Sequence, residues 1–223
     1  MKLLIKFPTR NRKNKFFNTL KKYHSLCEDI NNLKFLISID EDDSEMNNPD
    51  TLEILKTFKN TEVIIGNSTS KIDAVNRDII IDNSWDIILL ASDDMIPQIK
   101  GYDTIIIEKM KLIYPNTDGV LWFNDGFQET RLNTLCILGK KYYERFNYIY
   151  YPEYKSTWCD NEFMSVATIL NKQTYFNEVI IKHEHPDWGY GNRDNIHNKN
   201  QNDLSYDNNL FVERKKNNFN LIA

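Results

Sequence analysis

Apolar runs alternate with amphipathic segments through the first half of the chain. Five short apolar runs are typical of β-strands and cover 2–7, 34–39, 62–66, 85–91 and 118–123. Four segments between them repeat apolar residues at helical spacing and cover 13–26, 49–58, 70–81 and 101–114. Because strands that alternate with helices of this length form βαβ units, the pattern predicts an α/β fold with a mostly parallel central sheet.

The second half of the chain is less regular. We predict a strand at 134–139, a helix at 159–170 and a further strand at 178–185. From 187 to 203 the chain is polar and rich in Asn, which predicts a loop, and a short closing helix is expected at 204–216. The pattern contains no linker and no internal repeat, so we expect one domain over residues 1–223.

The composition narrows the class of protein. With 41% hydrophobic and 13% aromatic residues the chain can build a core, which argues against global disorder. A formal net charge of −4 provides no overall basic field of the kind that marks nucleic-acid-binding proteins. The three cysteines are far apart and lack zinc-finger spacing. No apolar run is long enough to span a membrane and the first residues are too soon charged for a signal peptide, so we expect a soluble, cytoplasmic protein.

Polar residues follow each of the five predicted strands. These loops read PTRNR (8–12), DEDD (40–43), GNSTSK (66–71), SDD (92–94) and NDG (124–126). The carboxyl ends of parallel strands meet at one edge of a sheet, where ligands bind in open α/β folds. Carboxylates that share an edge repel one another unless a cation lies between them. Mg²⁺ or Mn²⁺ fits such oxygen ligands, and Arg10, Lys71 and Arg77 are placed to pair with phosphate oxygens.

The pair Asp93 and Asp94 ends the apolar run at 85–91 and carries most of this argument. Taken alone, the two aspartates are explained as well by a turn or a helix N-cap as by a ligand site. Together with the neighbouring strand ends, they favour a site for a metal and a diphosphate.

The ordered segments KFPTRNR, ISIDEDD, SKIDAVNRDI and DIILLASDDM resemble the glycosyltransferases of the GT-A fold, especially those of family 2. The similarity covers residues 2–125. It implies a three-layer α/β/α sandwich in which 1–125 bind a nucleotide-sugar, 126–186 carry the acceptor and catalytic half, and 187–223 form a polar tail or lid. The chain departs from the family by having SDD where a full D-x-D motif is common. Which carboxylate meets the metal is therefore open, and we expect Asp94, with Asp93 on the ribose or as a second ligand.

The resemblance also implies a donor site along these strand ends. Asp40 or Asp42 would lie near the base and ribose, while Lys71 and Arg77 would neutralise the diphosphate. The expected nucleotide-sugar-binding residues are Pro8, Thr9, Arg10, Arg12, Asp40, Asp42, Lys71, Asn76, Arg77, Asp93, Asn124 and Asp125. The donor expected from the resemblance is a UDP-sugar, and the expected cofactor is Mn²⁺ or Mg²⁺.

The family places a catalytic carboxylate at the start of a helix beyond the fifth strand. The segment WCDNEFMSVA offers Asp160 as the first candidate and Glu162 as the second. An alcohol is a poor nucleophile at neutral pH, so an inverting transferase needs a base beside the acceptor hydroxyl. The position of Asp160 also fits a simple helix N-cap, and a retaining route stays open if no base is needed.

A late histidine often completes the metal shell in this fold, and KHEHPDWG carries His183 and His185. We expect His185, then His183, to be the ligand, which would favour Mn²⁺ over Mg²⁺; a structural role for either histidine is the alternative. Trp188 and Tyr190 could form a lid that stacks on a sugar. Trp122 would face the acceptor or donor sugar, or belong to the core.

The acceptor is the least determined part of the prediction. A glycan hydroxyl is one option, and a hydroxymethylated DNA base of a phage is another. Basic residues between Arg10 and Lys22, with Lys140 and Lys141, could contact phosphates, although a solvated helix face also explains them. Two alternatives to a transferase are a non-catalytic nucleotide- or sugar-binding module and a sugar nucleotidyltransferase. The absence of glycine after the first strand argues against the second.

Overall fold

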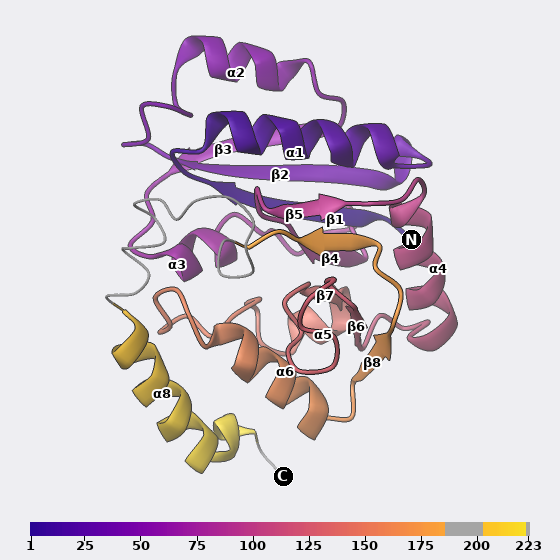
Figure 1. Ribbon diagram of the computed structural model, residues 1–223, viewed down its shortest axis with the longest axis vertical. Helices are drawn as coiled ribbons and strands as arrows, with labels where there is room; N and C mark the ends of the chain where they lie inside the picture. Colours follow the sequence, from indigo (N-terminus) through magenta and orange to yellow (C-terminus); the bar gives the residue numbers. More distant parts are fainter. Residues whose placement is uncertain (186–202, 222–223) are drawn as a thin grey trace.

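The computed structural model describes residues 1–185 and 203–221 (Figure 1). The strands are β1 (Leu3–Thr9), β2 (Leu33–Asp40), β3 (Thr61–Gly66), β4 (Ile87–Leu90), β5 (Met95–Pro97), β6 (Val120–Phe123), β7 (Ile137–Gly139), β8 (Gln173–Phe176) and β9 (Ile181–His183). The α-helices are α1 (Lys13–Leu26), α2 (Pro49–Lys56), α3 (Lys71–Asn76), α4 (Tyr102–Ile113), α5 (Lys140–Glu144), α6 (Cys159–Ile169) and α8 (Leu204–Lys216). Every predicted strand and helix is present, whereas β5, β8 and α5 were not predicted. The predicted loop at 187–203 and the aromatic residues expected to form a lid lie outside the described residues, apart from Asp203.

The central sheet has seven strands in the order β3-β2-β1-β4-β7-β6-β8. Neighbours pair in parallel except β7, which is antiparallel to both β4 and β6. Because β7 is antiparallel to the strand on each side of it, β6 and β8 run parallel to β1. The α/β fold with a mostly parallel sheet is therefore confirmed, and the carboxyl ends of β1, β2, β3, β4 and β6 all point to one edge.

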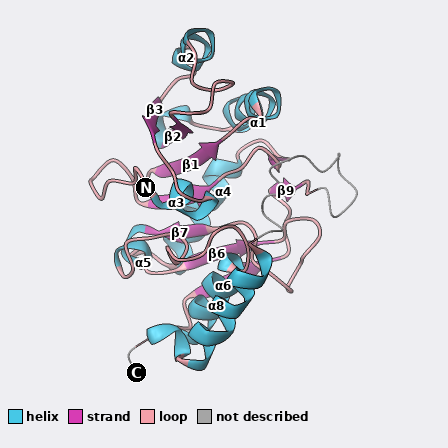
Figure 2. Cartoon of the chain, turned by 90° about the vertical axis from the view of Figure 1, so that its left-hand side faces the viewer, coloured by secondary structure: helices cyan, strands magenta, loops and turns pink. Residues whose placement is uncertain are grey.

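Two hydrophobic clusters cover the two faces of this sheet. Alternate residues of β1 separate them, because Leu3, Ile5 and Phe7 belong to one cluster and Leu4 to the other. The first cluster is completed by buried residues of α1, α2 and α4, and the second by residues of α3, α5, α6 and α8. The predicted three-layer α/β/α arrangement follows from this division, and Figures 1 and 2 show the helices on either side of the strands.

Helix α3 ends at Asn76, earlier than the predicted end at 81. Ser70 caps its first turn by accepting a hydrogen bond from the amide of Asp73. At its other end Arg77 is extended and Asp78 has a φ of 71°, in the left-handed region. The sequence periodicity continued past this point, but the backbone turns away and directs Arg77 toward the end of β2.

A second, two-stranded sheet joins β5 to β9, the orange strand next to β5 in Figure 1. The strands are antiparallel, and Met95 pairs with His183. Strand β5 follows directly on the aspartates after β4, whereas β9 lies near the end of the described stretch 1–185. This pairing brings the late histidines to the carboxyl edge of β4.

In the part of the chain that the structure describes, no helix is long and apolar enough to cross a membrane.

Candidate functional site

Arginines from the β1 loop contact carboxylates from two neighbouring strand ends. Arg10 donates to Asp40 at 2.7 Å and forms a two-pronged contact with Asp42 at 2.6 and 2.7 Å. Arg12 donates to Oδ1 of Asp93 at 3.0 Å. The predicted donor-site residues of β1, β2 and β4 are thus brought together. Arg10 pairs with carboxylates here, whereas the sequence argument placed it on a phosphate.

The two aspartates after β4 differ in environment. Burial raises the pKa of Asp93, the Arg12 guanidinium works against this, and the neighbouring Asp94 adds to it. Its Oδ2 is buried and accepts no hydrogen bond from any described residue, and the same holds for the hydroxyl of Thr9. Polar atoms buried in this way usually have a partner, and at this edge ordered water or a bound ligand can supply it.

Asp94 is held in its charged form. Burial would raise its pKa, but contacts with His183 and Ser92 and the charge of Lys71 together bring it well below its ordinary value. The Oγ of Ser92 hydrogen-bonds to its Oδ1, and Nε2 of His183 lies 3.7 Å from the same oxygen. Charges that split the pKa values of two adjacent carboxyls in this way are typical of functional sites.

The small sheet fixes His183 in this position. The amide of His183 donates to the carbonyl of Asp125 at 3.0 Å, and the amide of Glu184 donates to the carbonyl of Asp94 at 2.7 Å. The sequence argument favoured His185, but the register places His183 against the carboxylate. The two imidazole rings lie 5.6 Å apart, with His185 beyond the end of β9.

The donor set of this corner fits a divalent cation that is shared with a ligand. Among the described residues no three His, Cys, Asp or Glu side chains gather closely enough to hold a metal by themselves. One carboxylate and one imidazole are nevertheless adjacent in Asp94 and His183. Mg²⁺ and Mn²⁺ in phosphate-handling sites are commonly bound by one or two side chains, with phosphate oxygens and water completing the shell.

The amino ends of α3 and α6 bring Lys71 and Asp160 to the same corner. Burial raises the pKa of Asp160, partly offset by the amide of Asn161 and the charge of Lys71. The ammonium of Lys71 lowers the pKa of both Asp94 and Asp160, so the three groups lie within electrostatic reach of one another. Trp158 is the N-cap residue of α6. The N-cap position expected for Asp160 therefore belongs to Trp158, although Oδ1 of Asp160 accepts a hydrogen bond from the backbone amide of Asn161 in the same turn at 2.9 Å.

Glu162 is committed to a structural contact. It is buried and receives two hydrogen bonds from Nε of Arg214 at 2.8 and 3.0 Å and one from Nη2 at 2.7 Å. The hydroxyl of Tyr154 donates to it at 2.8 Å. Because its carboxylate already neutralises a buried arginine, Glu162 is a poor candidate for the acceptor base.

Two other predicted donor-site residues also hold the scaffold. The side-chain amide nitrogen of Asn76 donates to the carbonyl of Tyr150 at 2.7 Å. The side-chain oxygen of Asn76 accepts from the backbone amides of Ile149 and Tyr150. Asp125 is buried and accepts from two backbone amides at 2.8 and 2.6 Å and from Thr134 at 2.6 Å. The structure gives both side chains a local architectural role that their polarity alone did not reveal.

The remaining residues predicted in β6 and just after it lie in the core or near the surface. Asn124 accepts a hydrogen bond from the amide of Gly126 and donates one to Asn177. Trp122 is buried and packs edge-on against Tyr175, with ring centroids 5.1 Å apart. Of the two interpretations of Trp122, the core position is the one that the structure supports.

Beneath the β2 end lie Arg77, which the sequence argument named, and the buried Lys6, which it missed. Arg77 donates to the carbonyl of Ile39 at 2.9 Å and pairs with Asp78 at 2.8 Å. Lys6 of β1 is fully buried, donates to the carbonyl of Arg77 at 2.8 Å and hydrogen-bonds to Ser38. Burial lowers the pKa of Lys6 to about 7, against the opposing charge of Asp78. A lysine in an apolar strand gives no periodicity signal, so only the structure reveals it.

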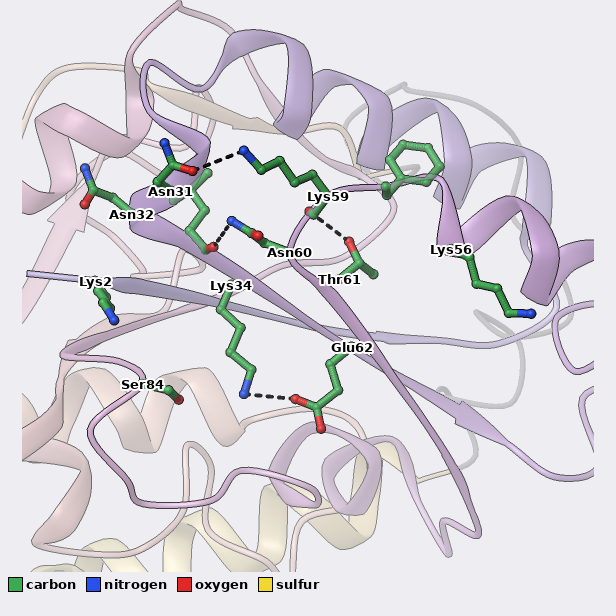
Figure 3. A pocket seen from close by; sticks show the side chains of 12 residues that line it. Lys2, Asn31, Asn32, Lys34, Lys56, Lys59, Asn60, Thr61, Glu62 and Ser84 are labelled. Atoms are coloured by element: carbon green, nitrogen blue, oxygen red, sulfur yellow. Dashed lines mark hydrogen bonds and ion pairs between the residues drawn. The ribbon is translucent and has the colours of Figure 1, made fainter.

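A separate depression of about 640 Å³ lies at the opposite, amino edge of the sheet (Figure 3). Its lining includes Lys2, Lys34, Lys56 and Lys59 together with several asparagines. Lys34 pairs with Glu62 at 2.9 Å, and Lys59 donates to Asn31 at 3.1 Å. The lining lies around the starts of β1, β2 and β3 and includes the end of α2, so this depression is remote from the aspartates after β4.

No protein-family model and no curated protein matches the sequence. Solved structures share its architecture. The mannosyltransferase PcManGT from Pyrobaculum calidifontis, in complex with GDP-Man and Mn²⁺, aligns with a TM-score of 0.65 at 12% identity, over 85% of this chain and 58% of that one. The chain has a GT-A-like glycosyltransferase fold.

The 1–349 portion of S. aureus TarS gives a second comparison. Its complex with UDP aligns with a TM-score of 0.61 at 15% identity, over 82% of this chain and 60% of that one. Its complex with UDP-GlcNAc gives a TM-score of 0.59. The present chain spans about three fifths of the length of these neighbours. In the GT-A-like fold, the edge described above is the one formed by the carboxyl ends of the parallel strands, where ligands gather in open α/β sheets.

Proposed function

We propose that this protein is a metal-dependent glycosyltransferase that moves a sugar from a nucleotide-sugar to an acceptor hydroxyl. The observation that carries this proposal is the convergence of Asp94, His183, Lys71 and Asp160 at the carboxyl edge of the sheet. The fold is that of proteins solved with GDP-Man and Mn²⁺ or with UDP-GlcNAc. A UDP-sugar remains the first donor to test, and a GDP-sugar is the second.

The residues would divide the work as follows. Arg10, Asp40 and Asp42 would contact the base and ribose, since they form the end of β2 and the loop beside it. Asp94 and His183 would hold a divalent cation, with Asp93 on the ribose or as a further ligand. When bound, that cation supplies positive charge to the departing diphosphate. Lys71 adds a second positive charge at the same corner.

Asp160 is the proposed base for the acceptor. Its raised pKa makes the ionised carboxylate a stronger proton acceptor than an ordinary aspartate. The acceptor hydroxyl would give its proton to Asp160 while its oxygen bonds to the anomeric carbon. The bond from that carbon to the diphosphate oxygen breaks, releasing the nucleoside diphosphate and inverting the anomeric centre. In this proposal residues 1–125 bind the donor and 126–186 serve the acceptor.

A donor-hydrolysis screen tests the proposal without knowledge of the acceptor, because water is a slow substitute for it. UDP-, GDP-, CMP- and dTDP-sugars would be incubated with the protein and Mn²⁺, and release of the nucleotide would be measured. We expect release from one nucleotide class that EDTA abolishes and Asp160→Asn slows. A protein that binds a nucleotide with Mn²⁺ but never releases one from a sugar would be a binding module instead.

A further inference from the structure

Helix α8 attaches to the rest of the protein through an unusual face. Its buried residues are Asp207, Phe211 and Arg214, which are spaced four and three residues apart and so share one side of the helix. Helices normally bury an apolar stripe, yet two of these three side chains are charged. Figure 2 shows α8 beside α6, and Figure 1 shows the same neighbourhood from another side.

Asp207 binds the chain just before α6. Its side chain is fully buried, and its Oδ1 accepts a hydrogen bond from the amide of Lys155 at 2.8 Å. Its Oδ2 accepts from the amides of Ser156 and Thr157 at 2.9 and 2.8 Å, and from the hydroxyl of Thr157 at 3.2 Å. Three successive backbone amides thus point at one carboxylate. This contact sets the path of the backbone that enters α6.

Phe211 and Arg214 continue the same attachment along the first turn of α6. The ring of Phe211 lies 5.3 Å from that of Trp158, the N-cap residue. Arg214 makes the buried bidentate pair with Glu162 described above. The face of α8 therefore contacts residues 155–158 and Glu162, which flank Asp160 on both sides.

Trp158 shows why this segment needs support. Its φ of 61° lies in the left-handed region, which is unfavourable for a residue other than glycine. Such a conformation persists only where the surroundings enforce it. The backbone amides that bind Asp207 lie immediately before Trp158. Glu162, which pairs with Arg214, lies two residues after Asp160.

We propose that α8 positions the catalytic base: Asp207, Phe211 and Arg214 fix the entry of α6 so that Asp160 faces the donor corner. This inference rests on the proposed function. In it, Asp207 and Arg214 are positioning residues that touch neither donor nor acceptor. A shift of about 1 Å in a catalytic group can lower turnover by roughly 100-fold without a change in donor affinity.

Asp207→Asn tests this directly, because the amide is the same size but has one oxygen acceptor in place of two. At least one of the three backbone amides then loses its partner. Asp103→Asn is the matched control. Asp103 is also fully buried and accepts from two successive backbone amides, those of Glu28 and Asp29 at 2.8 and 3.1 Å, on the other face of the sheet.

Three measurements decide the outcome: kcat for donor hydrolysis with Mn²⁺, the Kd for the nucleotide with Mn²⁺, and amide hydrogen exchange across the chain. For Asp207→Asn we expect kcat to fall by about 10- to 100-fold, Kd to stay within twofold, and exchange to rise mainly at 155–162. Asp103→Asn should leave kcat unchanged. If Asp207→Asn does not fold, Arg214→Lys, which keeps the charge but loses the two-pronged contact, should show the same pattern more weakly.

Unchanged kcat in Asp207→Asn, or a parallel loss of kcat and nucleotide affinity with exchange raised everywhere, would overturn the positioning role. A wild-type protein that binds no nucleotide with Mn²⁺ would instead contradict the proposed function. Even if the wild type binds no nucleotide, faster exchange confined to 155–162 in Asp207→Asn would support the role of α8 in holding this segment. Unchanged exchange at 155–162 would overturn that role.

Discussion

Nε2 of His183 lies 3.7 Å from Oδ1 of Asp94, although 88 residues separate them in the sequence. The contact exists because β9 pairs with β5 and sets His183 opposite Met95, the residue after Asp94. An imidazole and a carboxylate at this spacing can share one cation, and imidazole shifts the preference from Mg²⁺ toward Mn²⁺.

The two histidines should therefore differ in their effect on metal binding. We expect His183→Ala to weaken Mn²⁺-dependent nucleotide binding by about tenfold, as loss of one ligand reduces the charge and number of donors around the ion. His185→Ala should change it by less than threefold, since His185 lies beyond the strand that contacts Asp94. Titration of nucleotide affinity against Mn²⁺ concentration checks this. The reverse order of effects would restore the sequence-based preference for His185.

Asp160 and Glu162 are separated by one residue, but substitution of Asp160 should lower turnover and substitution of Glu162 should lower stability. Asp160→Asn removes the proposed base, so turnover should fall by roughly 10²- to 10⁴-fold while the free energy of unfolding changes little. Glu162→Gln leaves Arg214 buried and without its counter-charge, which costs about 3–5 kcal/mol of stability.

Kinetics and urea unfolding of the two variants separate the roles. Tyr154→Phe is a useful control, because it removes one hydrogen bond to Glu162 but keeps the ion pair. It should lower the free energy of unfolding by only about 1 kcal/mol. Normal turnover in Asp160→Asn would remove it as the base, and normal stability in Glu162→Gln would show that the pair contributes little.

His24 makes stability depend on pH. It stacks on Phe35 with ring centroids 4.2 Å apart, and its Nε2 is buried without a hydrogen-bond partner among the described residues. Burial lowers its pKa to about 4 in the folded protein, against about 6.5 in an unfolded chain. Between these values the unfolded state binds one more proton, so stability is lost as the pH falls from 6.5 toward 4, by at most about 1.4 kcal/mol per pH unit.

His24→Phe keeps the stacking and removes the titration. The difference in unfolding free energy between this variant and the wild type should widen in favour of the variant as the pH is lowered from 7.5 to 5. Chemical denaturation across that range measures it. The acidic residues titrate in both proteins and cancel in the difference, so parallel curves would show that His24 is not held neutral.

The sequence predicted those features of the fold that depend on local, periodic patterns of apolar and polar residues. Uninterrupted apolar strands such as β4 and the polar turns after them are visible as patterns, and they located Asp93 and Asp94 on the correct edge. Strand β5 spans only Met95–Pro97 and follows directly on the two aspartates, so no separate apolar run marks it in the sequence. It was therefore missed, and the register that places His183 rather than His185 beside Asp94 could not be predicted. Polar side chains with a structural role, such as Asn76, look the same in sequence as those that bind a ligand.

The attachment of α8 shows a second limit. Its helical span was predicted correctly. Its buried face, however, includes Asp207 and Arg214, charged residues that are normally expected to be exposed. The burial of such charges depends on partners that are distant in the sequence, here the amides before α6 and Glu162. The same holds for Lys6, whose partners come from β2 and from the end of α3.

Isothermal titration of UDP and of GDP, each with Mn²⁺ and with EDTA, against wild type and Asp94→Asn tests the central claim most directly. The account predicts that one nucleotide binds the wild type at least about tenfold more tightly with Mn²⁺, a difference of roughly 1.4 kcal/mol, and that Asp94→Asn loses this difference. Affinities that are the same with Mn²⁺ and with EDTA for both nucleotides, or a metal effect that survives in Asp94→Asn, would contradict it.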